Sequence, residues 1–308
     1  MRLLITGATG LLGINLSLVA VGQGHQVTGL SHSHGLVNAP FDLLKVDLVD
    51  TGSAIDLIEG VKPEAMIHCA ALADLNAAQN APDKAYQINC EAAGDLAAAA
   101  SRWGIPFIHV STDAVFDGTT GGYREEDQVN PLSVYAQTKL AGEELVMRMH
   151  PDAIIARVVF FGWSISGERS LSEFFYNNLR KGEQIQGFTD AYFSPLYVED
   201  LADTLLEMLD FGLTGLYHVV SPENLSKYDF GVRIAQRFGY DPHLIEPVRM
   251  KALWRGAPRS SNLVLNPDKV QRALGHSLPT VVQGIERFYQ RFLEKYPQLL
   301  QGYIKNTL

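Results

Sequence analysis

A glycine-rich turn at the start of the chain is the strongest constraint on its fold. It reads Thr-Gly-Ala-Thr-Gly-Leu-Leu-Gly, between the apolar segment 2–6 and the helix-length segment 11–22. Small residues there let the backbone approach a pyrophosphate, and the helix N-terminus attracts the anion. We therefore predict a dinucleotide site; a purely structural turn is the alternative. The residues predicted to bind the dinucleotide are Gly7, Thr9, Gly10, Leu11, Leu12 and Gly13.

Apolar runs alternate with longer amphipathic segments up to residue 158. The expected strands are 2–6, 26–30, 43–46, 65–69, 106–111 and 153–158. The expected helices are 11–22, 51–59, 83–102 and 134–149. Hydrophobic strands separated by helices favour an α/β fold, a doubly wound, Rossmann-like parallel sheet covered on both faces. Its ligands would bind beyond the carboxyl ends of the strands.

The regular alternation ends after residue 158, where loops rich in Gly, Ser, Tyr and Pro begin. Further helices are expected near 171–181, 201–209, 227–238 and 280–294. We therefore expect a dinucleotide-binding domain over residues 1–158 and a smaller C-terminal substrate-binding lobe over 159–308. Part of 197–220 is expected to return to the main sheet, so a single boundary is an approximation.

The charge and the apolar pattern exclude several classes of partner. The 308 residues include 25 Lys and Arg against 34 Asp and Glu, for a formal net charge of −9. This charge repels nucleic acid and anionic membranes, so neither is an expected partner. No apolar run of about 18 residues and no signal segment occurs, which predicts a cytoplasmic protein. Cys69 and Cys90 lie in apolar segments and are expected to be reduced structural thiols.

The end of the second expected strand bears on the choice of cofactor. An acidic residue here would bind the ribose diol of NAD, but residues 30–35 read Leu-Ser-His-Ser-His-Gly. Ser31 and His32 could accommodate a 2′-phosphate, so NADP(H) is favoured. NAD(H) stays open because this stretch contains no arginine. His32 and His34 have no acidic or cysteine neighbour in the sequence, so we expect a solvated loop and no metal site.

Tyr135 and Lys139 stand one helical turn apart, and Thr112 ends the expected strand 106–111. An ammonium beside a tyrosine lowers the phenol pKa from its usual value of about 10. Tyr135 could then donate a proton to a carbonyl oxygen that Thr112 polarises, while Lys139 holds the nicotinamide ribose. The three residues predict a carbonyl reductase or alcohol dehydrogenase. A surface tyrosine and lysine at a chance spacing are the alternative.

A basic segment near the C-terminus is a candidate for substrate binding. Its cations are Arg249, Lys251, Arg255 and Arg259. In an acidic protein, Arg255 and Arg259 could clamp a diphosphate with Trp254 beside a nucleobase; an ordinary solvated loop is an equal alternative. Trp163 and Tyr192 are expected to pack the lobe rather than stack on a base.

Together these motifs resemble the extended short-chain dehydrogenase/reductase superfamily, and within it the dTDP-4-dehydrorhamnose reductase group. The resemblance covers nearly the whole chain, and its most group-specific string is Ser-Thr-Asp-Ala-Val-Phe-Asp-Gly. The segments that carry it are 6–13, Asp47-Leu48, Ala70-Ala71, 111–118, 135–139, 194–197 and 225–228.

The resemblance implies roles for individual residues. Thr112, Tyr135 and Lys139 would form the catalytic triad, and Asn89 would match the superfamily's catalytic-helix asparagine. For the cofactor, Asp47 and Leu48 would flank the adenine, and Ala70 and Ala71 would line the cleft. The residues after Thr112 are candidates for substrate binding, namely Asp113, Val115 and Phe116.

The chain departs from the group's pattern at three places. His68-Cys69 stands where the group usually has asparagine before the paired alanines. Residues 157–162 read Arg-Val-Val-Phe-Phe-Gly in place of Arg-Thr-Ser-Trp-Val-Tyr-Gly, which makes the cleft wall more apolar. Residues 257–263 match the group's Arg-Pro-x-x-Ser-x-Leu pattern only loosely. Substrate identity is therefore the least constrained inference.

The implied reaction is NADPH-dependent reduction of the 4-keto group of a nucleotide-activated deoxysugar. A dehydratase of the superfamily should carry an acidic residue where Ala114 stands. A sugar-nucleotide epimerase usually retains NAD tightly, which the missing acidic residue after the second strand argues against. A non-catalytic NADP-binding regulatory subunit, similar to the beta subunit of methionine adenosyltransferase, is the alternative from another class. The sequence does not fix the oligomeric state, for which a homodimer is the candidate.

Overall fold

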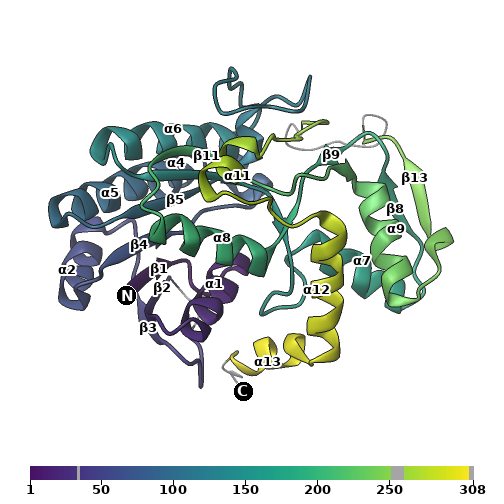
Figure 1. Cartoon of the computed structure of the whole chain (residues 1–308), viewed down its shortest axis with the longest axis horizontal. Helices are drawn as coiled ribbons and strands as arrows, with labels where there is room; N and C mark the ends of the chain where they lie inside the picture. Colours follow the sequence, from purple (N-terminus) through teal and green to yellow (C-terminus); the bar gives the residue numbers. More distant parts are fainter. Residues whose placement is uncertain (33–34, 251–259, 305–308) are drawn as a thin grey trace.

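The computed structural model describes residues 1–32, 35–250 and 260–304. A seven-stranded parallel sheet in the order β11-β6-β5-β4-β1-β2-β3 forms its centre (Figure 1). The strands are β1 (Arg2–Thr6), β2 (Gln26–Ser31), β3 (Asp42–Lys45), β4 (Ala65–His68), β5 (Phe107–Thr112), β6 (Ile154–Val158) and β11 (Gly215–Val219). Strand order reverses between β1 and β4, which is where doubly wound folds bind ligands. The predicted α/β fold is confirmed.

Helices cover both faces of this sheet (Figure 1). On one face α1 (Leu11–Gly22) packs against α8 (Val198–Asp210). The other face carries α2 (Thr51–Val61), α5 (Ala92–Trp103) and α6 (Val134–Met149). Successive β1 side chains enter opposite cores, since Leu3 and Ile5 join one apolar cluster and Leu4 the other. Burial on both faces explains why the strands are almost continuously hydrophobic.

The helical segment expected over 83–102 is present, unbroken from 82 to 103, but it is not one regular α-helix. The chain forms α3 (Leu75–Asn80), α4 (Pro82–Tyr86), a π-helical segment (Gln87–Glu91) and then α5. The π-helical segment interrupts the regular helical pattern, and Asn89 within it is fully buried. The amide of Asn89 donates to Thr138 Oγ1 at 3.0 Å and accepts from the Leu72 N–H at 2.8 Å. These contacts tie the loop after β4 to α6.

The remaining elements form a lobe at the carboxyl end of the sheet (Figure 1). Its helices are α7 (Leu171–Arg180), α9 (Lys227–Phe238), α12 (Val281–Leu293) and α13 (Tyr296–Gly302), while α11 (Asp268–Leu274) packs against β11 of the main sheet. Its paired strands are β7 (Phe160–Phe161) with β10 (Leu196–Tyr197), β8 (Ile185–Phe188) with β13 (Ile245–Val248), and β9 (Tyr192–Phe193) with β12 (Leu225–Ser226). Because β11 lies in the main sheet, we propose a lobe over 159–308 that returns this strand to the first domain.

The aromatic core of the lobe includes one residue that the sequence singled out. The Trp163 ring stacks on Phe288 with centroids 4.0 Å apart, and its indole N–H donates to the Phe288 carbonyl. Trp163 is therefore a packing residue, as predicted. Across the described residues, none of the helices has the length and apolar character that a membrane crossing requires.

Candidate active site

The glycine turn brings β1 directly onto α1. Gly7 has a φ of +66°, a region that disfavours other residues, and the Gly10 N–H donates to the Gly7 carbonyl at 2.8 Å. A Cβ at Gly13 would collide with that same carbonyl. Among the described groups, no side chain caps α1 at Gly10. The first N–H groups of α1 thus suit an anion such as a pyrophosphate.

A cavity of about 420 Å³ opens beside this turn. Predicted cofactor ligands that line it are Gly7, Thr9, Gly10, Ser31, His32, Asp47, Leu48, Ala70 and Ala71. By contrast, Leu12 and Gly13 are buried, and Leu11 belongs with them to the first turn of α1. These three residues shape the turn from behind, because Gly13 packs on the backbone of Gly7 and Ala8. The cofactor role of the lining residues stays a prediction.

The tertiary structure adds charges to this cavity that the sequence did not indicate. Asp47 lies beside His32, with Oδ2 3.5 Å from Nε2, so His32 does have an acidic neighbour. Lys84 of α4 and Arg169 of the loop before α7 are exposed and line the same cavity. Neither cation stands near the glycine turn in the sequence, so no local motif could have identified them.

Thr112, Asp113 and Tyr135 lie together on a second cavity, of about 260 Å³. Thr112 Oγ1 donates to Asp113 Oδ1 at 3.1 Å and accepts from the Ala114 N–H. Burial raises the pKa of Asp113 to about 6, against the hydrogen bond from Thr112 and the charge of Lys227. Val115 and Phe116 are fully buried, so their predicted contact with substrate is wrong. The 3₁₀ turn Asp113–Val115 directs these two apolar side chains into a core cluster.

The predicted lowering of the Tyr135 pKa is also wrong for this structure. Burial raises the phenol pKa to about 12, while a hydrogen bond with the Thr112 side chain acts in the opposite direction. Lys139 directs its ammonium elsewhere: Nζ donates to the Val110 carbonyl at 2.7 Å and to His109 Nε2 at 3.1 Å. Tyr135 is therefore held as a neutral phenol at physiological pH.

Lys139 is 2% exposed, which is unusual for a lysine. Burial lowers its pKa to about 8, and the carboxylate of Glu143 one turn later opposes this shift. Glu143 itself accepts from the Ser111 hydroxyl and from Arg157 Nη2, the latter at 2.7 Å. One face of α6 is thus anchored to the carboxyl ends of β5 and β6.

Two local features place α6 at this position. The Ser133 hydroxyl accepts from the Ala136 N–H at 3.2 Å and caps the helix just before Tyr135. A Cβ at Gly142 would collide with the Asn89 carbonyl, so glycine permits the close approach of α6 to the π-helical segment. Asn89 lies behind the site as a buried brace, and its predicted catalytic role stays a prediction.

Comparison with known proteins identifies the family of this chain. The family model described as RmlD substrate binding domain matches residues 1–294. The chain belongs to this family. A probable low-salt glycan biosynthesis reductase, Agl14 of Haloferax volcanii, is 37% identical over 90% of this chain and 93% of its own length. A dTDP-4-dehydrorhamnose reductase of Mycobacterium tuberculosis is 33% identical over 86% and 84%.

Two further relatives bear on function. The methionine adenosyltransferase 2 subunit beta of Bos taurus is 31% identical over 95% of this chain and 88% of its own length. A crystal structure of the dTDP-4-dehydrorhamnose reductase of Bacillus anthracis in complex with NADP has a TM-score of 0.84 at 25% identity, covering 94% of this chain and 99% of that one. Membership of the RmlD family confirms the resemblance inferred from the motifs.

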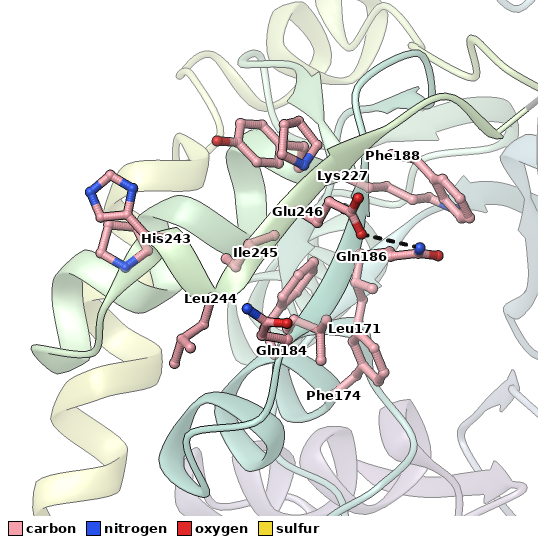
Figure 2. Close-up of a pocket in the computed structure, with 16 residues that line it drawn as sticks. Leu171, Phe174, Gln184, Gln186, Phe188, Lys227, His243, Leu244, Ile245 and Glu246 are labelled. Carbon is pink, nitrogen blue, oxygen red and sulfur yellow. Dashed lines mark hydrogen bonds between the residues drawn. The ribbon is translucent and has the colours of Figure 1, made fainter.

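A larger groove of about 1120 Å³ lies in the lobe (Figure 2). Its walls come from α7, β8, α9 and β13. Gln186 of β8 donates to Glu246 at 3.3 Å, and these two residues are opposite each other on the paired strands β8 and β13 (Figure 2). Lys227, the first residue of α9, lines both the groove and the 260 Å³ cavity. Lys227 belongs to the segment 225–228 that resembles the family, but no local pattern indicated its position between the groove and the cavity.

Tyr192 does not pack the lobe as predicted. It is 41% exposed and lines the 260 Å³ cavity, because β9 pairs with β12 at the cavity edge. Arg255 and Arg259 lie outside the described residues, so the predicted diphosphate clamp stays a prediction. Both cysteines are free thiols, as expected, and Cys69 lines the 420 Å³ cavity.

Proposed function

We propose that this protein reduces the 4-keto group of a nucleotide-activated deoxysugar, with NADPH favoured as the reductant. It is an NAD(P)-dependent oxidoreductase of the short-chain dehydrogenase/reductase type, which follows from its family. One observation carries the finer proposal: Thr112 and Tyr135 share a hydrogen bond on a small cavity, next to a lysine whose ammonium is buried.

The side chains on this cavity can complete the reduction. When bound, NADPH supplies the hydride that the carbonyl carbon receives. Tyr135 donates its phenolic proton to the carbonyl oxygen, and the Thr112 hydroxyl turns from Asp113 to donate a hydrogen bond to the same oxygen. The raised pKa of Tyr135 keeps that proton in place until the oxygen gains charge. Lys139 would hold the nicotinamide ribose, because its ammonium is directed to β5 rather than to the phenol.

We assign the 420 Å³ cavity to the dinucleotide. The glycine turn and the N-terminus of α1 would hold the pyrophosphate, and Asp47 and Leu48 would lie beside the adenine. Lys84 and Arg169 supply the cationic charge that the stretch after β2 lacks. Either can pair with a phosphate, which supports NADP(H) as the favoured cofactor while NAD(H) stays compatible.

The sugar end of the substrate fits the 260 Å³ cavity, and the nucleotide end fits the groove beyond Lys227. A lysine at the junction suits a diphosphate that bridges the two parts. His243 adds a second nitrogen donor to the groove, while Tyr192 offers an exposed ring at the cavity edge. The groove is thus large and polar enough for a nucleoside.

A regulatory subunit is the second candidate. It is favoured by the 31% identity to methionine adenosyltransferase 2 subunit beta over 95% of this chain. Such a protein would bind the dinucleotide in the same cavity but would not turn over a ketosugar.

Steady-state NADPH oxidation with a panel of nucleotide-linked 4-ketosugars separates the two candidates. We expect turnover with a dTDP-4-keto-6-deoxysugar and none with the corresponding 4-hydroxy sugar. Absence of NADPH consumption with every ketosugar in the panel would overturn the reductase proposal. Stoichiometric co-purification with a methionine adenosyltransferase catalytic subunit would then support the regulatory role.

A further inference from the structure

Two buried histidines lie beneath the candidate active site. His68 of β4 and His109 of β5 occupy paired positions in the parallel register, and both are fully buried. Their rings stack with centroids 5.4 Å apart and planes 19° from parallel. Toward β1, His68 Nδ1 lies 2.8 Å from Thr6 Oγ1, and this hydroxyl accepts from the Ala70 N–H. Toward α6, His109 Nε2 lies 3.1 Å from Lys139 Nζ.

Both imidazoles are neutral. Burial lowers the pKa of His68 to about 3 and that of His109 well below its ordinary value, and the charge of Lys139 adds to both shifts. A neutral imidazole has one donor and one acceptor nitrogen. Because His109 Nε2 faces an ammonium, it must be the acceptor, so the proton of His109 lies on Nδ1. The lysine contact therefore fixes the tautomer.

The ammonium of Lys139 has three N–H donors. One donates to the Val110 carbonyl and a second to His109 Nε2, both on β5. These two acceptors come from adjacent residues of one buried strand and fix the rotation of the ammonium. Among the described residues, none accepts from the third N–H, so this donor is left for a ligand.

We infer that His109 is a positioning residue for Lys139: its Nε2 holds the ammonium so that one N–H is presented to the nicotinamide ribose. The inference rests on the proposed role of Lys139 in cofactor binding. It gives the buried imidazole a task that β-strand packing alone would not require, since a leucine fills a similar volume.

Several other groups face Lys139 and bear on its titration. They are Glu143 on α6, Cys69 and His68 at the end of β4, Cys90 in the π-helical segment, and His109 on β5. Glu143, Cys69 and Cys90 each favour the charged ammonium, while burial opposes it. Loss of the His109 acceptor would remove one more stabilising contact, so the ammonium would give up its proton at a lower pH.

The test compares NADPH affinity across pH for the wild type, His109→Leu, His109→Gln and the control His150→Leu. His150 is also buried, and its Nε2–H donates to the Ile105 carbonyl at the far end of α6. In the wild type we expect affinity to fall above about pH 8, where Lys139 loses its proton. His109→Leu should weaken binding about tenfold at neutral pH, the size typical of one hydrogen bond to a charge, and move the fall to lower pH.

The glutamine variant should restore most of the affinity because its amide oxygen can accept from the ammonium, whereas His150→Leu should change neither quantity. A folded His109→Leu protein with the affinity and pH profile of the wild type would overturn the inference. If the leucine variant does not fold, His109→Asn replaces it, since its shorter amide cannot reach Nζ. NADPH binding needs no ketosugar, so an inactive wild type with a weakened His109→Leu would reject the proposed reaction and keep this inference.

Discussion

The two cavities of this protein are built in different ways. Apart from Lys84, Ile88 and Arg169, the described lining of the 420 Å³ cavity comes from residues before 73, and much of it is backbone or small side chains. The 260 Å³ cavity takes its described lining from residues 73 to 263. A turn that binds an anion is a local structure, whereas a catalytic wall needs side chains from several strands and helices.

Their electrostatics differ for the same reason. The cations of the dinucleotide cavity are exposed, so water and salt screen them. The groups around the catalytic cavity are buried, and burial shifts their pKa values to about 12 for Tyr135, about 8 for Lys139 and about 6 for Asp113. Changes at the catalytic cavity should therefore have large effects that depend on pH, and changes at the first cavity smaller effects that depend on salt.

The largest expected effect is at the catalytic cavity. Tyr135→Phe removes the proton donor and should lower kcat by about 10³-fold, within the usual range for general acid catalysis. NADPH affinity should stay unchanged, because the phenol lies on the other cavity. Steady-state kinetics and NADPH titration check both values, with Tyr86→Phe on exposed α4 as the control. Full turnover by Tyr135→Phe would show that the cavity does not use this tyrosine.

A backbone change tests the local nature of the first cavity. Gly13→Ala places a Cβ against the Gly7 carbonyl. The substitution should lower the free energy of unfolding by about 1–3 kcal/mol and should also weaken NADPH binding. In the matched Gly22→Ala control, no described heavy atom lies within 4 Å of the new Cβ. Urea unfolding and NADPH titration measure the two effects. Equal stability of both variants would mean that the turn tolerates expansion.

The buried histidines predict acid sensitivity on the catalytic side. His218 stacks edge-on against Phe116, and burial lowers its pKa from 6.5 to about 3. Between these values the unfolded chain binds the extra proton, so stability falls as pH falls, by about 1.4 kcal/mol per pH unit for this group. When the pH is lowered from 6.5 to 5, the free energy of unfolding of His218→Leu should therefore fall by about 2 kcal/mol less than that of the wild type.

Urea unfolding at the two pH values measures that difference, and the intrinsic cost of the substitution cancels from it. The exposed His32 of the dinucleotide cavity is the control, since His32→Leu should keep the acid sensitivity of the wild type. If His218→Leu had the same sensitivity as the wild type, the imidazole would be charged or hydrated in the folded protein.

The smallest effect is expected at the exposed cations. Arg169→Ala should weaken NADPH binding by roughly fivefold, since an exposed ion pair contributes at most about 1 kcal/mol. The loss should shrink in high salt because screening already weakens the contact. Isothermal titration at two salt concentrations checks it, with the exposed Lys181→Ala as a control away from the cavity. A salt-independent loss would instead place Arg169 in a dehydrated contact.

Much of the fold could be predicted because its determinants are local. Six of the seven strands of the main sheet, all but β11, were predicted to within a residue or two, and helices 11–22 and 134–149 match α1 and α6. The helical segment over 83–102 was also found, but its π-helical part was not, because such a segment depends on what packs against it, here Gly142 on α6, rather than on helix propensity. Val115 and Phe116 were predicted to contact the substrate, but the 3₁₀ turn after Thr112 directs their side chains into a core cluster.

The sequence by itself determined the doubly wound fold, the dinucleotide turn and the spacing that aligns Tyr135 with Lys139, because each follows from residues within a few positions of one another. The tertiary structure decided which charges meet. It paired Lys139 with His109 rather than with the phenol, placed Arg169 beside the glycine turn and put Lys227 between cavity and groove. These contacts join distant segments, and their strength depends on how far packing excludes water, which no local pattern records.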